Sequence, residues 1–132
     1  MTFETFSEYI SRQPRESVLS QPAQELILSI RGQKRAVAVE RIVYLEGDGN
    51  YTNIVLRDGS RVLVARTLRD YELMLDSRLF VRIHKSCMVN LQFVISIDLG
   101  KDAALELTNG QLMRISRRRV QEFRERMAQP AE

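Results

Sequence analysis

Four arginines crowd the start of the last helix that the sequence predicts, and a cluster of this kind can bind anions. They are Arg114, Arg117, Arg118 and Arg119. The amino-terminal end of a helix carries a positive partial charge, so arginines in its first turn oppose the helix dipole and repel one another. A phosphate group among them would make the arrangement favourable. The alternative is a solvated charged face in which Glu122 and Glu125 are the partners, and the residues alone favour neither interpretation.

A second basic group lies near the end of a predicted strand. Its members are Arg82, His84 and Lys85. His84 is the chain's one histidine, and a lone histidine is more often structural than a direct ligand. Further cations around Arg61 and at 66–69 have acidic neighbours, so the charge pattern assigns them mainly to solvated surface.

The sequence offers little for catalysis. A metal site needs clustered histidine, cysteine or carboxylate ligands, and this chain has one histidine and one cysteine. His84 and Cys87 are three residues apart, and on a single strand that spacing places them on opposite faces. Gly47–Asn50 lacks the glycine spacing of a phosphate-binding loop or a dinucleotide fingerprint. We therefore predict a protein that is not an enzyme and has neither a metal nor a small-molecule cofactor.

The composition is that of an ordinary soluble domain, with 132 residues, of which 44% are hydrophobic and 28% charged. This length fits one domain with short extensions, able to fold without disulfides or metal. The net charge of +3 only hints at an anionic partner. A single cysteine fits a reducing cytoplasm. There is no apolar run of the roughly 18–20 residues that span a bilayer and no signal-peptide pattern. We expect a cytoplasmic protein without a membrane partner.

From Glu25 onward the hydrophobic pattern predicts strands joined by tight turns. The predicted strands and short apolar runs are Glu25–Arg31, Ala36–Glu40, Ile42–Glu46, Tyr51–Arg57, Arg61–Ala65, Leu79–Ile83, Met88–Leu91, Phe93–Ile97, Ala104–Thr108 and Gln111–Ile115. In the fourth segment Thr52, Ile54 and Leu56 share one face. The Asp58-Gly59 and Asn109-Gly110 pairs are hairpin signals. Successive hairpins indicate a mainly β fold with antiparallel sheets.

Helices are predicted at three places. Thr67 begins an inserted helix, with Asp70 three residues later. Its apolar stripe consists of Leu68, Tyr71 and Leu75. Ser116 begins the last helix. Its apolar side consists of Val120, Phe123 and Met127. Residues 1–24 are predicted to form a short amphipathic helix and a linker, residues 25–127 the domain, and residues 128–132 a flexible tail.

Several short motifs, in the right order, resemble those of LytTR domains. The motifs are Ile42-Val43-Tyr44-Leu45-Glu46 with Asn50-Tyr51, Thr67-Leu68, Phe80, Arg82-Ile83-His84-Lys85-Ser86 with Val89-Asn90, and Asn109-Gly110 with Ile115-Ser116-Arg117-Arg118. They resemble the family's I-x-Y-x-E…N-Y, T-L, F-x-R-x-H, R-x-H-(R/K)-S…V-N and N-G…(V/I)-S-R-R patterns. Each fragment alone is weak, but together they cover about residues 25–127 and are specific.

LytTR domains are DNA-binding modules of bacterial transcription regulators, often in two-component systems. The resemblance implies an elongated set of small antiparallel sheets whose loops reach the bases in successive major grooves. By position, it implies base contacts from Asn50, Lys85 and Arg117. It also implies weaker candidates for phosphate contacts at Arg118, Arg61, Arg82, His84 and Ser86. The expected partner is double-stranded DNA at a repeated site bound by two copies, which a homodimer would supply.

Alternatives stay open for several of these residues. Asn50 is either a base contact or only a turn residue that needs a positive φ. His84 and Ser86 either touch the DNA backbone or hold their loop. Tyr51 is interpreted as a packing residue and Cys87 as a small buried apolar residue.

Two other functions also stay open. An RNA-binding module would display exposed aromatic residues on a sheet, and only 7% of this chain is aromatic. A protein-interaction or dimerisation module is a further hypothesis, against which the arginine cluster at 117–119 argues. LytTR domains usually follow a receiver domain, a sensor domain or membrane helices, and only residues 1–24 precede this one. A free-standing regulator and a fragment are therefore both compatible with the sequence.

Overall fold

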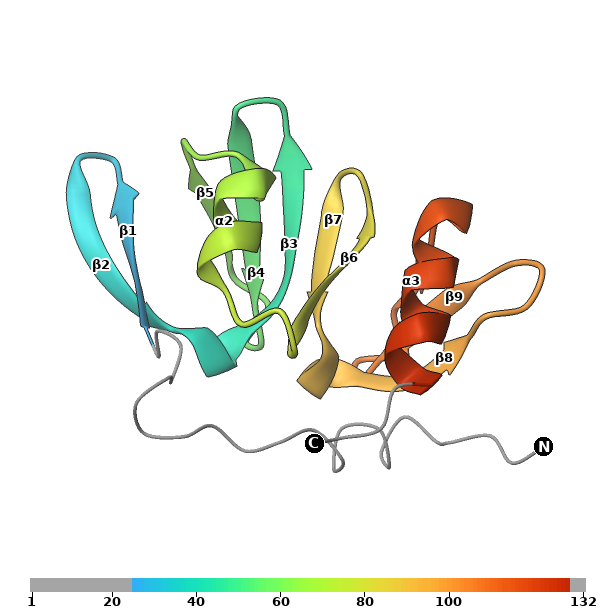
Figure 1. Ribbon diagram of the computed structural model, residues 1–132. Coiled ribbons are helices and arrows are strands. Elements are labelled where there is room, and N and C mark those ends of the chain that lie inside the picture. Colours follow the sequence, from blue (N-terminus) through green and yellow to red (C-terminus); the bar gives the residue numbers. More distant parts are fainter. Residues whose placement is uncertain (1–24, 129–132) are drawn as a thin grey trace, which may run out of the picture.

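The computed structural model describes residues 25–128, with side chains to residue 125, and strands dominate this part of the chain (Figure 1). A five-stranded sheet of order β5-β4-β3-β7-β6 stands between a two-stranded sheet, β1-β2, and a three-stranded sheet of order β10-β9-β8. The strands are β1 (Glu25–Ile30), β2 (Gln33–Ala38), β3 (Ile42–Asp48), β4 (Tyr51–Leu56), β5 (Arg61–Val64), β6 (Phe80–His84), β7 (Cys87–Asn90), β8 (Val94–Asp98), β9 (Ala104–Leu107) and β10 (Leu112–Arg114). The helices are α2 (Leu68–Met74) and α3 (Arg117–Ala128). The predicted mainly β, antiparallel fold with an inserted helix and a C-terminal helix is confirmed.

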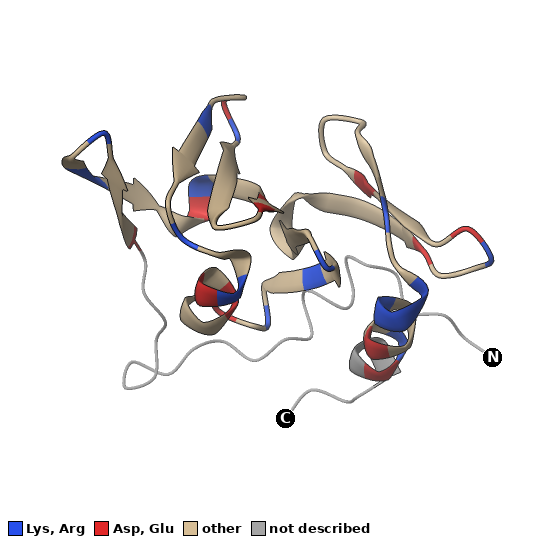
Figure 2. Cartoon of the chain, turned by 90° about the horizontal axis from the view of Figure 1, so that it is seen from above, with Lys and Arg blue, Asp and Glu red and all other residues tan. Residues whose placement is uncertain are grey.

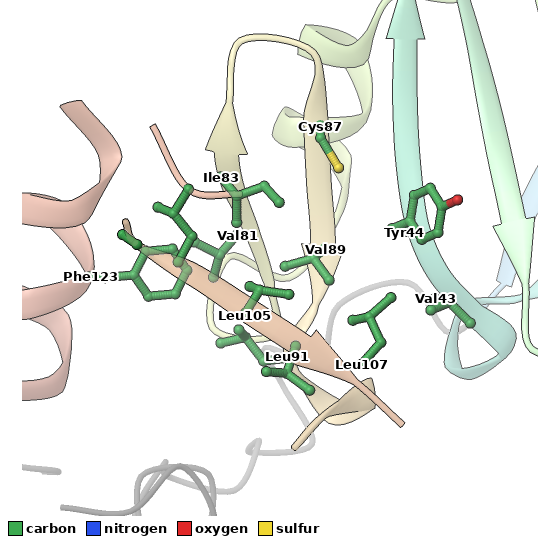
Figure 3. Close-up of a cluster of buried hydrophobic side chains, with 13 residues drawn as sticks. Val43, Tyr44, Val81, Ile83, Cys87, Val89, Leu91, Leu105, Leu107 and Phe123 are labelled. Carbon is green, nitrogen blue, oxygen red and sulfur yellow. The ribbon is translucent and has the colours of Figure 1, made fainter. Parts of the chain in front are cut away.

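The five-stranded sheet is covered on both faces. Tyr44 on β3 pairs with Val89 on β7, and both belong to a buried cluster that the three-stranded sheet and α3 complete (Figure 3). The next pair, Leu45 and Met88, belongs to a second cluster completed by α2 and the β1–β2 hairpin. Successive side chains on a strand point to opposite faces. The continuous apolar run in β3 is therefore that of a strand buried on both sides.

The predicted alternation in β4 is confirmed, because Thr52, Ile54 and Leu56 are all buried. Thr52 is the polar member of this face, and its hydroxyl donates to the carbonyl oxygen of Arg66 at 2.7 Å. A buried hydroxyl needs such a partner. The bond also ties β4 to the segment that leads into α2.

The helix α2 begins as the sequence predicts. Thr67 and Asp70 form a reciprocal capping box, in which each side chain accepts from the other residue's backbone N–H at 3.3 Å. The predicted stripe is buried against β3, β4 and the β1–β2 hairpin. Its members are Leu68, Tyr71 and Leu75. This packing fixes the direction in which the opposite face of α2 points.

The helix α3 is held against the three-stranded sheet and β6. Phe123 is only 2% exposed and packs with Leu105 and Ile83 in the cluster of Figure 3. Arg124 donates to the carbonyl oxygen of Leu99 at 2.7 Å. The side chain of Met127 lies outside the described part of the chain.

Strand bounds differ from the prediction where short turns are irregular. β2 begins at Gln33 rather than Ala36, because Arg31 and Gly32 form a two-residue turn in which both φ angles are positive, 51° and 79°. Single 3₁₀ turns at Val39–Arg41 and Leu91–Phe93 lead from one sheet to the next. Asn90 caps the second turn.

Asn90 is buried, and its side-chain polar atoms are satisfied by backbone groups. Its side-chain oxygen accepts from the Gln92 N–H at 2.9 Å, and its amide nitrogen donates to the Ile42 carbonyl oxygen at 2.8 Å. The residue thus joins β7 to β3 as well as capping the turn.

The predicted placement of His84 and Cys87 on opposite faces of one strand is wrong. The chain reverses at Lys85–Ser86, and His84 pairs with Cys87 across the β6–β7 hairpin. This turn contains no glycine, proline or asparagine, so it has no strong turn signal in the sequence. Cys87 is buried, as expected, and burial followed by the nearby Glu46 charge raises the pKa of its thiol to about 12. A thiol that stays protonated is a poor nucleophile.

Within residues 25–128, no helix is long and apolar enough to cross a membrane. The helix predicted within residues 1–24 and the tail after Ala128 lie outside the described residues.

Candidate nucleic-acid interface

Three turns and the start of α3 lie along one edge of the molecule, the upper edge in Figure 1. We name this surface the turn edge and define it by the turns Arg31–Gly32, Gly49–Asn50 and Lys85–Ser86 and by Arg117 at the start of α3. Neighbouring strands of an antiparallel sheet reverse at the same edge, which explains why β3–β4 and β6–β7 turn side by side.

Two backbone hydrogen bonds align these turns. The Gly47 N–H donates to the Ser86 carbonyl oxygen at 2.8 Å, which joins the β3–β4 hairpin to the β6–β7 turn. The Ser116 N–H donates to the Ile83 carbonyl oxygen at 2.9 Å, which places the start of α3 beside the end of β6. The structure therefore brings to one edge the three residues predicted to contact bases.

Asn50 occupies the second position of a two-residue hairpin turn. Gly49 has the positive φ of this turn, 60°, and Arg31 is the one non-glycine residue with a positive φ in the described part of the chain. The interpretation of Asn50 as a residue required for a positive φ is therefore wrong. Its side chain is exposed and makes no hydrogen bond within residues 25–128. Tyr51 beside it is 50% exposed and belongs to neither buried cluster.

Lys85 stands at the tip of the β6–β7 turn, exposed, and its ammonium group has no partner among the described residues. The neighbouring side chains turn back onto the loop. The Ser86 N–H donates to Nδ1 of His84 at 3.1 Å, and the Ser86 hydroxyl lies at the same distance from Nδ1. Partial burial, with the positive charge of Arg82 adding to it, lowers the pKa of His84, so the imidazole is neutral at pH 7 and can accept.

Arg82 is turned inward, and its side chain is only 15% exposed. Nε donates to the His84 carbonyl oxygen at 3.1 Å, and Nη1 pairs with the Glu72 carboxylate at 3.0 Å. Nη2 donates to the Lys85 carbonyl oxygen. The guanidinium group is therefore occupied by partners within the domain.

The arginines at the start of α3 divide into two kinds. Arg119 is half-buried and pairs with Glu122 at 3.1 Å, as the solvated-face interpretation predicted. Arg117 and Arg118 are exposed, and neither has a hydrogen-bond or ion-pair partner in the part of the chain that the structure describes. Of the two acidic partners proposed for the cluster, Glu122 pairs with Arg119, whereas Glu125 accepts from the Gln121 side chain.

Arg61 does not lie at the turn edge. It opposes Val55 near the far end of β4, four residues and roughly 13 Å from Tyr51. Its guanidinium group pairs with Glu46 at 3.0 Å, and both side chains are about half exposed. This is the solvated surface position that the charge pattern indicated.

The family model for the LytTr DNA-binding domain matches residues 32–128, which include the β3–β4 and β6–β7 turns and α3. The chain belongs to this family. The LytTr DNA-binding domain of a putative methyl-accepting/DNA response regulator from Bacillus cereus has the same fold, with a TM-score of 0.70 and 20% identity over 81% of this chain and 99% of that structure.

Two curated relatives are longer proteins. The heme-containing CO-sensing transcriptional regulator RcoM 1 of Paraburkholderia xenovorans (strain LB400) is 36% identical over 87 residues, which are 64% of this chain and 32% of that protein. RcoM 2 of the same organism is 28% identical over 120 residues, which are 87% of this chain and 45% of that protein. The matched part of the chain therefore covers 32% and 45% of the length of these relatives.

This LytTr domain has further cations on the turn edge that strand periodicity alone overlooks. They flank the β1–β2 turn, are all exposed, and appear at the tip of that hairpin in Figure 2. The three are Arg31, Lys34 and Arg35. Three cations within five residues around a glycine were the available signal in the sequence.

Proposed function

We propose that this LytTr domain binds double-stranded DNA in a sequence-specific manner through its turn edge. The observation that carries the proposal is a contrast between free and occupied side chains. Lys85 and Arg117 are exposed at the turn edge without partners among the described residues. Arg61 and Arg82 have carboxylate partners. A charged side chain that serves no partner within the domain is available to a ligand.

The chemistry of the exposed groups fits base recognition. Lysine and arginine donate to the O6 and N7 acceptors of guanine, and asparagine forms two hydrogen bonds with adenine. We assign these contacts to Lys85, Arg117 and Asn50. Two-residue hairpin turns project few atoms beyond the sheet, so they can enter a major groove about 12 Å wide.

We assign the phosphate contacts to the exposed cations that flank these turns. They are Arg118, Arg31, Lys34 and Arg35. His84 and Ser86 bond to each other, which supports a role in holding their loop. We leave Arg61 out of the contact set because it lies away from the turn edge.

We further propose that the domain is the DNA-binding part of a bacterial transcription regulator, acts in the cytoplasm and has no catalytic activity. The two curated relatives are transcriptional regulators by name, which supports this role. Binding by two copies to a repeated site would enlarge the recognised sequence beyond what one copy covers.

The test is selection of binding sites from a random duplex DNA pool at near-physiological salt, with a single-stranded RNA pool in parallel. Enrichment of a short repeated duplex motif is the expected outcome. If about four to six phosphates are neutralised, the log–log salt slope should be roughly −4 to −5. Weak, salt-sensitive binding without enrichment would contradict sequence-specific recognition and favour the interaction-module hypothesis, and enrichment from the RNA pool alone would favour the RNA hypothesis.

A further inference from the structure

The β6–β7 turn is held from inside the domain by the mostly buried side chain of Arg82. Arg82 points back under the turn and donates to two consecutive carbonyl oxygens, those of His84 and Lys85. The remaining nitrogen of its guanidinium group, Nη1, pairs with Glu72 of α2, which is 27% exposed. The planar fork of arginine presents a separate nitrogen to each of these three acceptors, whereas lysine has one nitrogen for all of them.

This support sets the direction of the peptide groups around Lys85. Pairing between β6 and β7 is irregular between Arg82 and His84, so the regular ladder does not define the turn. The two carbonyl oxygens that point to Arg82 face inward, and the Lys85 side chain is exposed on the outside. Without the guanidinium group the turn would have to find other donors and other backbone angles.

The same support joins two turns of the turn edge. Glu72 lies on α2, whose first residue, Leu68, packs against Gly47 so closely that a Cβ at Gly47 would lie 3.2 Å from the Leu68 Cβ. The Gly47 N–H in turn donates to the Ser86 carbonyl oxygen. The helix α2, the β3–β4 hairpin and the β6–β7 turn therefore form one connected unit, with the pair of Arg82 and Glu72 at its centre.

We propose that Glu72 is a positioning residue for DNA recognition, and that it acts through Arg82 to hold Lys85 in the geometry that reads a base. This inference rests on the proposed function. It assigns to an acidic residue, whose charge repels DNA, a favourable role in specific binding. It also makes Arg82 a support of the loop rather than a phosphate contact.

The direction in which Glu72→Gln changes DNA affinity distinguishes a positioning role from a simple surface charge. If Glu72 is only a surface charge near DNA, Glu72→Gln removes repulsion and strengthens binding to every sequence. If Glu72 positions the turn, Glu72→Gln weakens binding to the selected operator by roughly 5- to 20-fold, while binding to unrelated duplex DNA stays equal or rises. The measurement is fluorescence anisotropy with operator and scrambled duplexes at several salt concentrations. Stronger binding to both duplexes would overturn the proposal.

Glu122→Gln is the matched control. It makes the same change of charge on α3, where Glu122 pairs with Arg119 three residues earlier, just as Glu72 also pairs with Arg69 on α2. We expect it to leave the ratio of operator to scrambled affinity unchanged. If the ratio of operator to scrambled affinity fell equally in Glu72→Gln and Glu122→Gln, the proposal would also be overturned, because the effect would then follow from charge alone.

Arg82→Lys tests the other member of the pair. Lysine keeps the positive charge, so a phosphate contact would be largely preserved and the salt slope nearly unchanged in both operator and scrambled binding. A positioning role predicts that Arg82→Lys loses at least as much operator affinity as Glu72→Gln, and that the double variant loses little more than Arg82→Lys alone. Additive losses would contradict a shared role.

A measurement without DNA keeps this inference separate from the proposed function. Hydrogen exchange of the Gly47 and Ser86 amides in the free protein should be faster in Glu72→Gln than in the wild type, with exchange in β9 unchanged as a check of the fold. If the wild type selects no operator but exchange accelerates, the proposed function fails and the support of the turn remains. If exchange at these amides is unchanged, the proposal fails whatever the DNA result.

Discussion

The β6–β7 turn and the start of α3 both present a basic residue on the turn edge, but they position it in different ways. At the turn, Lys85 is held by a polar network in which Arg82 donates to two carbonyl oxygens and pairs with Glu72. At α3, Arg117 is placed by the packing of Phe123 and by one backbone bond from Ser116. The comparison shows that an arginine in the sequence does not by itself indicate a DNA contact. Arg82 is mostly buried and bonds within the domain, whereas Arg117 is exposed and has no partner among the described residues.

The two regions should therefore fail differently when perturbed. A hydrogen-bond network loses geometry when one member changes, whereas a packed helix loses free energy of unfolding in proportion to the apolar volume removed. Four substitutions or conditions test this difference.

The largest expected effect is on the packing of α3. Phe123→Ala removes a ring that is 2% exposed and should lower the free energy of unfolding by about 3–5 kcal/mol, measured by urea denaturation. Operator affinity should fall as well, because the start of α3 loses its place beside β6. Leu112→Ala is the control, since Leu112 is 71% exposed and its removal should change stability by less than about 0.5 kcal/mol. Equal stability of the two variants would show that packing does not hold α3.

The second effect concerns the exposed arginine itself. Arg117→Ala should weaken operator binding by about 1–3 kcal/mol and relax base preference at one position, without loss of stability. Arg119→Ala is matched in type and lies two residues away, but Arg119 pairs with Glu122, so its removal should have a smaller effect on binding. If Arg117→Ala lowers affinity equally for all sequences, Arg117 contacts phosphate and the base contact at α3 is lost from the proposal.

Most of the fold could be predicted from the sequence, because local signals agree with tertiary structure there. Alternation in β4, the Thr67–Asp70 cap and the glycine turns each have a physical cause that acts over a few residues. The β6–β7 turn was missed because its stabilising contacts are not local in the sequence. Lys85–Ser86 has only the weak turn preference of serine, and the turn is stabilised by Arg82 and its partner on a different element.

The candidate site could be predicted only in part. The motif resemblance named Asn50, Lys85 and Arg117 as base contacts, and in the structure all three lie at the turn edge. It named Arg61 and Arg82 as phosphate candidates and could not show that Glu46 and Glu72 occupy them, because these ion pairs join residues 15 and 10 positions apart. Contacts at such separations depend on the register of strands and the docking of α2, which no short motif encodes.

A third prediction uses the N-terminal cap of α2 to perturb the β6–β7 turn without perturbing α3. Thr67→Ala removes the side chain that accepts from the Asp70 N–H and should lower the free energy of unfolding by about 1 kcal/mol. Because α2 carries Glu72, hydrogen exchange should accelerate at Ser86 more than at amides of α3 beyond its first turn. Thr108→Ala, an exposed threonine in the β9–β10 turn, is the control. Equal acceleration in both regions would indicate that α2 supports the whole domain rather than the β6–β7 turn.

The smallest effect is the part of the pH dependence of stability that comes from His84 in the β6–β7 turn. His84 is the chain's one histidine, and the folded protein lowers the pKa of its imidazole below the usual value of about 6.5, because of partial burial and the charge of Arg82. The unfolded chain therefore binds a proton more readily than the folded one. The stabilisation is complete above about pH 6.5 and is lost as the pH falls through the lower pKa of the folded state.

Protonation has a structural consequence at the same atom. It places a hydrogen on Nδ1, which then can no longer accept from the Ser86 N–H, so the turn that carries Lys85 should loosen while α3 does not respond. Urea denaturation between pH 5 and 7.5, with the imidazole titrated by NMR, measures both parts. His84→Gln should flatten the stability profile over this range, because a glutamine oxygen can accept from Ser86 at every pH. If the pKa of His84 in the folded protein were at or above 6.5, the imidazole would not be held as a neutral acceptor. The polar network would then lack the bond between His84 and Ser86, one of the bonds that distinguish this turn from the packed start of α3.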